Sequence, residues 1–199
     1  MLRFAMYAPV LTSLPLPITT RRLIVRDYTA ADAGSVFAYL QDAAYWQYQR
    51  SEAPTAAQIE SLMQWVVKEQ AVTPRTMYFL AATRKDTGEI VGEGVLKIVN
   101  PAERQGEIGF GVSPKFWKQG FGGEIAATVL DVAFQHFKLH RVAGQCTPDN
   151  KGSIRIMQKL GLAREGLLRD IHFSRGRWWS TLIYGILDQE YAKIRGLKK

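Results

Sequence analysis

The residue types with the clearest chemical use lie between Glu107 and Glu124, where the sequence reads Glu-Ile-Gly-Phe-Gly-Val-Ser-Pro-Lys-Phe-Trp-Lys-Gln-Gly-Phe-Gly-Gly-Glu. At its centre is the glycine cluster of residues 120–123, which directly precedes a stretch with helical spacing of apolar side chains. The first turn of a helix offers unpaired backbone N–H groups and the positive end of the helix dipole, and glycines let a phosphate approach them closely. The cluster therefore indicates a pyrophosphate-binding loop, to which Lys118 adds a positive charge.

A glycine cluster of this kind also occurs in three other structural settings, which differ in what surrounds it. A tight turn from a strand to a helix needs the same residues and no ligand. A dinucleotide-binding fold places its glycines after the first parallel strand, whereas these come late and follow an antiparallel meander. A P-loop ends in Gly-Lys-Ser/Thr, which is missing here. Both common nucleotide-binding folds therefore fit poorly.

The elements that must position this loop follow from hydrophobic periodicity and turn residues. Helices are expected after Thr29, from the capping box at Thr55 to about Thr73, over residues 122–138, and from Asn150 to Gly161. The aromatic stretch around residues 45–52 is expected to be a loop. Strands are expected over residues 22–28, 77–83, 90–99, 106–112, 141–146, 166–173 and 178–187. This pattern predicts an α/β protein of the α+β type, with a mixed, mostly antiparallel sheet of about seven strands and helices on both faces.

Length and composition predict one domain. A chain of 199 residues with 47% hydrophobic and 22% charged residues can bury a single core. We divide it into an extended N-terminal arm (1–17), one domain (18–191) and a basic C-terminal tail (192–199). No apolar stretch is long enough to span a membrane. A single cysteine, Cys146, cannot form an intrachain disulfide, which suits a reducing compartment, so a cytoplasmic location is expected.

The charge pattern and the histidines point to no further site. The net charge of +8 favours acidic partners, but the basic residues are scattered, so we expect no specific nucleic-acid binding and no membrane association. A basic adaptor for RNA or the ribosome is the reading that this scatter disfavours. The histidines at positions 136, 140 and 172 are accompanied by neither a second cysteine nor a compact cluster of acidic residues, so no metal is expected.

Three groups of residues resemble, in order and spacing, motifs of the GNAT superfamily of acetyltransferases. They are Thr-Arg-Arg-Leu-Ile-Val-Arg at 20–26; Glu-Ile-Gly-Phe at 107–110 with Trp-Lys-Gln-Gly-Phe-Gly at 117–122; and Asn-Lys-Gly-Ser-Ile-Arg at 150–155 with Lys-Leu-Gly-Leu at 159–162. The resemblance covers nearly the whole chain and is strongest to the group that contains the ribosomal-protein N-terminal (alanine/serine) acetyltransferases. It implies the GNAT fold and an N-acetyltransferase that uses acetyl-CoA as co-substrate.

The resemblance also implies which residues hold acetyl-CoA. Asn150 and Ser153 would lie beside the pantetheine and the thiol. Two residues depart from the superfamily pattern: Trp117 stands where many members have Gln or Arg, and Leu162 replaces the more usual Phe. The strand backbone at Phe110, Gly111 and Val112 would bind the pantetheine arm, and the segment Trp117, Lys118, Gln119, Gly120, Phe121, Gly122 and Gly123 would hold the pyrophosphate.

Catalysis by direct attack in a ternary complex needs a neutral amine and a proton for the departing thiolate. Glu107 is the candidate base, acting directly or through water, with a solvated strand carboxylate or an arginine partner as the structural alternative. The tyrosine that the superfamily often uses as acid has no counterpart in residues 150–156, and Ser153 is the available hydroxyl. Its structural alternative is to satisfy backbone N–H groups in the first turn of its helix.

The acceptor pocket is expected to use aromatic residues from two sides, Trp46 and Tyr48 from one loop and Trp178 from the last hairpin; a core or an interface is the alternative role. The acceptor is a primary amine, either a protein N-terminus or a small molecule. A sensor that binds acetyl-CoA without turnover is the alternative function. The chain is expected to be a monomer or a homodimer.

Overall fold

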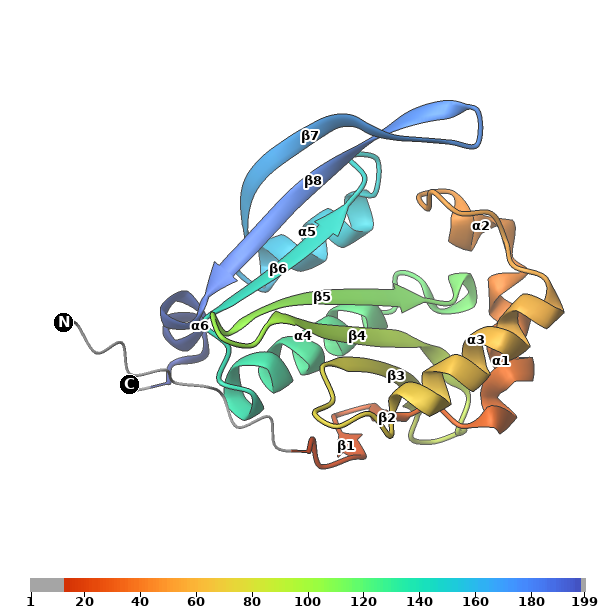
Figure 1. The fold of residues 1–199 in the computed structure, drawn as a ribbon, viewed down its shortest axis with the longest axis horizontal. Coiled ribbons are helices and arrows are strands. Elements are labelled where there is room, and N and C mark those ends of the chain that lie inside the picture. Colours follow the sequence, from red (N-terminus) through yellow and green to blue (C-terminus); the bar gives the residue numbers. More distant parts are fainter. Residues whose placement is uncertain (1–12, 198–199) are drawn as a thin grey trace.

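Eight strands form one sheet in the computed structural model, which describes residues 13–197 (Figure 1). Their order across the sheet is β1-β2-β3-β4-β5-β6-β8-β7, and β5 with β6 is the one parallel pair. The predicted mixed, mostly antiparallel sheet is confirmed, with a two-residue first strand that the sequence did not reveal. The strands are β1 (Ile18–Thr19), β2 (Leu23–Asp27), β3 (Met77–Arg84), β4 (Ile90–Asn100), β5 (Gln105–Val112), β6 (Arg141–Cys146), β7 (Ala163–Ser174) and β8 (Arg177–Leu187).

Helices cover both faces of this sheet (Figure 1). Side chains of α4 pack with those of β3, β4 and β5 in the larger hydrophobic core, while α1 and α3 cover the other face with a smaller one. The helical elements are η1 (Ala30–Asp32), α1 (Ala33–Leu40), α2 (Ala43–Trp46), α3 (Ala56–Glu69), η2 (Pro114–Phe116), α4 (Phe121–Asp131), the π-helical η3 (Val132–His136), α5 (Lys151–Lys159) and α6 (Asp188–Arg195).

Local signals account for most helix ends. Thr55 and Gln58 form the predicted capping box, because the Thr55 hydroxyl accepts from the Gln58 N–H at 3.3 Å and the Gln58 side chain accepts from the Thr55 N–H at 2.8 Å. Within the stretch predicted to be a loop, α2 forms a single turn, and the Asp42 side chain caps it by accepting from the Ala44 N–H at 2.9 Å.

The predicted domain boundaries can be compared with the structure fully at the C-terminal end and only in part at the N-terminal end. Most of the predicted arm of residues 1–17 lies outside the described residues. At the other end, α6 runs through the predicted boundary at residue 191. Tyr191 is buried, and its hydroxyl donates to Asp131 at the end of α4 at 2.8 Å. Within residues 13–197, no helix is both long and apolar enough to cross a membrane.

A gap in the middle of the sheet sets up the functional site. Strands β5 and β6 pair only from Gln105 opposite Arg141 to Ile108 opposite Gly144. Beyond that point β5 follows β4, β6 follows β8, and the two strands diverge (Figure 1). The backbone of β5 therefore loses its neighbour on one side from Gly109 onward.

The β7–β8 hairpin arches over this gap towards the α2 loop (Figure 1). Its turn residues, Arg175 and Gly176, both have positive φ angles, of 50° and 71°. Two such residues give the tight turn whose twist matches paired strands. The predicted hairpin turn is confirmed. The length of β7 and β8 carries this turn towards the loop after α2 (Figure 1).

Candidate active site

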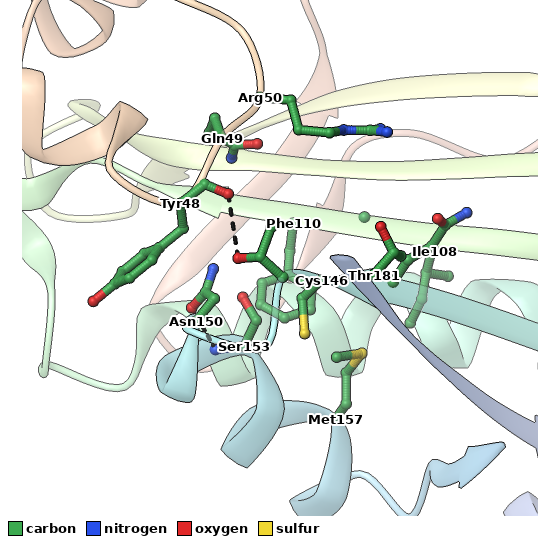
Figure 2. Close-up of a pocket in the computed structure, with 13 residues that line it drawn as sticks. Tyr48, Gln49, Arg50, Ile108, Phe110, Cys146, Asn150, Ser153, Met157 and Thr181 are labelled. Carbon is green, nitrogen blue, oxygen red and sulfur yellow. Dashed lines mark hydrogen bonds between the residues drawn. The ribbon is translucent and has the colours of Figure 1, made fainter. Parts of the chain in front are cut away.

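A cavity of about 250 Å³ lies where β5 and β6 diverge (Figure 2). Its wall is formed by the two diverging strands with Thr147 after β6, by α5 with its N-cap, by the loop after α2 and by Thr181 of β8. Of the residues predicted for the site, Tyr48, Phe110, Asn150 and Ser153 are in this wall. The complete lining is Tyr48, Gln49, Arg50, Ile108, Gly109, Phe110, Gln145, Cys146, Thr147, Asn150, Ser153, Met157 and Thr181.

The backbone of β5 presents polar groups to this cavity. Ser113 N–H donates to the Val91 carbonyl at 2.8 Å, so the backbone groups of alternate residues from Ser113 point towards β4. Phe110 and Val112 therefore point their backbone groups to the opposite side, which β6 has left. Because the Trp117 indole N–H already donates to the Val112 carbonyl at 2.7 Å, the Phe110 N–H and carbonyl are the groups best placed to pair with an extended amide.

The glycine loop has the backbone geometry of an anion site. Lys118 and Gly120 both have positive φ angles, 62° and 82°, and Gly120 is the N-cap of α4. No side chain caps this helix, so its first N–H groups remain available. A Cβ atom added to Gly123 would meet no atom within 4 Å, which leaves open space beside them. The residues predicted to hold a pyrophosphate thus form a helix N-terminus with free amides.

A long-range ion pair fixes this loop, and no pattern in the sequence revealed it. The Glu124 carboxylate accepts from Thr20 Oγ1 at 2.6 Å and from Arg22 Nε at 2.7 Å. Arg22 Nη1 also donates to the Gln119 carbonyl at 2.8 Å, and its guanidinium lies 4.2 Å from the Phe121 ring centroid. Burial opposes ionisation of Glu124, but the hydrogen bonds from Thr20 and Arg22 outweigh it and lower its pKa. The turn between β1 and β2 therefore holds the loop, and Arg22 compensates Glu124.

The start of α5 brings two predicted residues into the cavity (Figure 2). Asn150 is the N-cap, and its side-chain oxygen accepts from the Ser153 N–H at 3.0 Å. The structural role considered for Ser153, satisfying a helix N–H, thus belongs to Asn150. The Ser153 hydroxyl makes no hydrogen bond within residues 13–197, so it is free to act on a ligand.

Glu107 lies close to the cavity without lining it. It is half-buried in the middle of β5, opposite Lys97 on β4 and Ala143 on β6. Gly109, two residues further along the strand, lines the cavity and shares the same sheet face. Glu107 therefore lies on the sheet face that Gly109 shares, outside the cavity wall.

A second carboxylate on that face escaped the sequence analysis. Glu93 on β4 accepts hydrogen bonds from the Tyr39 hydroxyl at 2.5 Å and from the Tyr45 hydroxyl. Burial raises the pKa of Glu93, although both hydrogen bonds oppose the shift. A Cβ atom on Gly111 would lie 1.9 Å from Glu93 Oε1, so Gly111 leaves the space that this group fills. No local pattern signals this cluster, because its three members come from α1, α2 and β4.

The roof of the cavity is the loop after α2, fastened to the hairpin tip. Arg175 Nη1 donates to the carbonyls of Trp46 at 2.7 Å and Gln49 at 3.0 Å, and Ser174 Oγ donates to the Arg50 carbonyl at 3.0 Å. From the other side, Thr147 Oγ1 donates to the Tyr48 carbonyl at 3.5 Å (Figure 2). These bonds hold the backbone of the loop in place over the cavity.

Two of the three aromatic residues predicted for the acceptor pocket lie elsewhere. Trp46 packs against the smaller core, and its indole N–H donates to the Leu40 carbonyl at 2.6 Å. Trp178 is 59% exposed on the hairpin and contacts Phe173 edge-on. Tyr48 alone of the three lines the cavity. Trp46 and Tyr48 are close in sequence but lie in different surroundings, because Trp46 ends a helical turn that packs against the smaller core.

Cys146 lies in the cavity wall, and burial dominates the behaviour of its thiol. Burial raises the pKa of the Cys146 thiol to about 11, against a smaller opposing effect of Lys151, although the side chain lines the cavity. Within residues 13–197, no group of three or more His, Cys, Asp or Glu side chains could hold a metal ion.

Comparison with known proteins gives concordant results. Residues 22–163 match the family described as Acetyltransferase (GNAT) domain. The uncharacterized N-acetyltransferase YnaD of Bacillus subtilis is 27% identical over 174 residues, which cover 87% of this chain and 98% of YnaD. A GNAT-family acetyltransferase of Bacillus anthracis superimposes with a TM-score of 0.76 at 27% identity, covering 88% of this chain and 100% of its own. The ribosomal-protein-S5-alanine acetyltransferase of Vibrio fischeri shares the fold, with a TM-score of 0.78 at 15% identity over 89% of this chain and 99% of its own.

Proposed function

Because the chain belongs to the GNAT acetyltransferase family, we propose that it transfers the acetyl group of acetyl-CoA to a primary amine by direct attack in a ternary complex. The observation that carries this proposal is the cavity between β5 and β6, which joins an open strand backbone to a helix N-terminus with free amides. The acceptor is a small-molecule amine or a protein N-terminus. A protein acceptor has its support in the fold shared with the Vibrio fischeri ribosomal-protein-S5-alanine acetyltransferase.

In this proposal the two ends of acetyl-CoA bind to different parts of the chain. The amides of the pantetheine arm pair with the Phe110 backbone beside Gly111 and Val112. The pyrophosphate binds the amides of residues 118–123, with Trp117 tying the loop to β5 and Lys118 adding charge. Arg22 supports this assignment, since it compensates Glu124 and leaves the helix N-terminus without an excess of negative charge.

Substituting Gly120 should weaken acetyl-CoA binding. Gly120 has a φ of 82°, and a Cβ there costs about 1–2 kcal/mol in the left-handed region. We expect Gly120→Ala to raise the Kd for acetyl-CoA about tenfold or more, because the strain is relieved by moving the loop amides. Calorimetric titration measures it.

The control for this prediction is Gly34→Ala in α1, away from the glycine loop. A Cβ at Gly34 meets nothing within 4 Å, and alanine favours the helix by up to about 1 kcal/mol. This variant should keep its affinity and gain slightly in thermal stability. Equal affinities for both variants would contradict the role assigned to the backbone of Gly120.

The chemical step has two proton transfers. The amine nitrogen attacks the thioester carbonyl carbon, the C–N bond forms, and the C–S bond breaks to release the CoA thiolate. We assign removal of the amine proton to Glu107 through water. Ser153, whose free hydroxyl faces the cavity, is assigned to donate a proton to the thiolate. Asn150 holds the helix that presents Ser153.

A covalent route through Cys146 is disfavoured by the burial of its thiol. Burial raises the pKa of this thiol to about 11, so the reactive thiolate is a minor form at pH 7. We expect Cys146→Ala to keep kcat within about threefold, and intact-protein mass spectrometry after incubation with acetyl-CoA alone should show no acetylated enzyme. An acetyl adduct that disappears in Cys146→Ala would contradict direct attack.

The test of the proposed function is release of CoA thiol from acetyl-CoA over a panel of amines, amino acids and short peptides. Turnover with one acceptor class supports the enzyme. Tight acetyl-CoA binding without turnover on any acceptor favours the sensor instead, and absence of binding contradicts both. We further propose a cytoplasmic protein, monomeric or homodimeric, on the ground of its single cysteine.

A further inference from the structure

The wall of the active-site cavity contains no carboxylate among the described residues. Apart from backbone groups, its polar members are amides, hydroxyls and one guanidinium. Asp149 and Glu52 lie nearby in sequence, and neither lines the cavity. A polycationic acceptor such as a polyamine requires opposite charges to offset the loss of its hydration. This wall offers none.

The guanidinium belongs to Arg50, on the loop that roofs the cavity. Only its backbone carbonyl is engaged, by Ser174 Oγ at 3.0 Å, and its side chain makes no hydrogen bond or ion pair within residues 13–197. The bonds from Arg175 and Thr147 to neighbouring carbonyls fix the backbone on both sides of the cavity. Arg50 is therefore an unpaired cation on a fastened backbone, a favourable arrangement for binding an anion.

Arg50 lies on the opposite side of the cavity from Asn150 and Ser153. In Figure 2 its side chain extends along that side above Thr181, with Phe110 between Arg50 and these two residues. Lys151, in the first turn of α5, is close enough to Cys146 to lower the pKa of its thiol, against the larger effect of burial. Two cations thus lie at or near the cavity, and no carboxylate among the described residues of its wall offsets them.

We infer that the acceptor is a small amine that carries a carboxylate, which Arg50 binds while the amine faces the thioester. This inference rests on the proposed function. The planar guanidinium matches a carboxylate with two parallel hydrogen bonds, and such charge-assisted pairs are the stronger ones. In the proposed complex the cavity of about 250 Å³ also receives the end of the pantetheine arm, so the remaining space suits an acceptor of the size of an amino acid or a short peptide end. Arg175 is a positioning residue, because it holds the loop and not the ligand.

The test measures kcat/KM for matched acceptors that differ only in the carboxylate. One pair is alanine and alaninamide; the other is alanyl-aspartate amide and alanyl-asparagine amide. Spermidine is the cationic comparator. If the carboxylate is required in the first pair, the acceptor is a free amino acid. If it is required in the second pair, the acceptor is a peptide end with an acidic side chain. Each acceptor is measured with wild type, Arg50→Gln and Arg50→Lys, so the ratio of wild type to variant cancels the intrinsic reactivity of the amine.

We expect Arg50→Gln to lower kcat/KM for the carboxylate acceptors about 10- to 100-fold and for their neutral partners less than twofold. Arg50→Lys should recover part of the loss. Arg164→Gln removes the same charge from an exposed position at the other end of β7 and should change neither value. Thermal melting shows whether each variant is folded.

The outcomes separate this inference from the proposed function. An equal loss for carboxylate and amide partners in Arg50→Gln would mean a structural role and overturn the inference. Preference of the wild type for spermidine would also overturn it while leaving the acetyltransferase intact. No turnover with any amine would overturn both.

Discussion

Glu107→Gln should lower kcat for acetyl transfer about 100-fold or more while leaving the Kd for acetyl-CoA unchanged. General base catalysis contributes typically about 10²- to 10⁴-fold, and amines of high pKa are mostly protonated near neutral pH. Glu107 shares its sheet face with Gly109, which lines the cavity, so one water can connect its carboxylate to the acceptor. Thiol release at saturating acetyl-CoA, measured from pH 6 to pH 9, tests this. The variant should recover activity at high pH, where the free amine becomes abundant.

The matched control is Glu93→Gln, on the neighbouring strand and the same face. Both oxygens of Glu93 already accept a hydrogen bond, from the hydroxyls of Tyr39 and Tyr45, and Glu93 does not line the cavity, so we assign it no proton transfer. We expect this variant to keep kcat within about fivefold and to lose stability, since a buried hydrogen-bond network costs about 1–3 kcal/mol when disturbed. Loss of turnover in Glu93→Gln with none in Glu107→Gln would exchange the two roles.

Gly92→Ala should be the most destabilising single methyl addition in the sheet. A Cβ atom at Gly92 would lie 2.1 Å from the Gly111 carbonyl oxygen and 2.9 Å from Val112 Cα. Both are backbone atoms of β5, so the strand itself must move, and it cannot do so without disturbing the site. We expect a loss of about 3 kcal/mol or more and a fall in Tm of about 10 °C. Denaturant titration and thermal melting measure the two values.

Gly109→Ala is the control for that prediction, because it adds the same methyl group to the facing strand. There the nearest neighbour of the new Cβ is Val95 Cβ at 3.5 Å, an ordinary contact. Its stability should change by less than about 1 kcal/mol. If the two variants unfold at the same temperature, the close approach of the β4 and β5 backbones is not the reason that position 92 needs a glycine.

Signals that span a few residues determined much of this protein without the structure. The capping pair Thr55 and Gln58 marked the start of α3, and Arg175-Gly176 marked the turn of the last hairpin. The glycines of residues 120–123 marked the start of α4. Each signal is readable because caps, turns and helix termini depend on backbone geometry within one or two turns of chain. The order and spacing of the motifs at residues 20–26, 107–122 and 150–162 indicated the family, which the family match confirms.

Only the tertiary structure decided which residues meet at the site. Arg22 reaches Glu124 across 102 positions in the chain, and Arg175 reaches the Trp46 carbonyl across 129. Neither pair has a local pattern, because an arginine on a strand or at a turn is compatible with solvent as well as with a distant partner. The length of β5 left unpaired by β6, the unpaired guanidinium of Arg50 over the cavity and the burial of Glu93 depend on how strands and loops pack. The periodicity of a sequence indicates which face of a strand is buried. Only the packing of the folded chain decides which residues that face contacts.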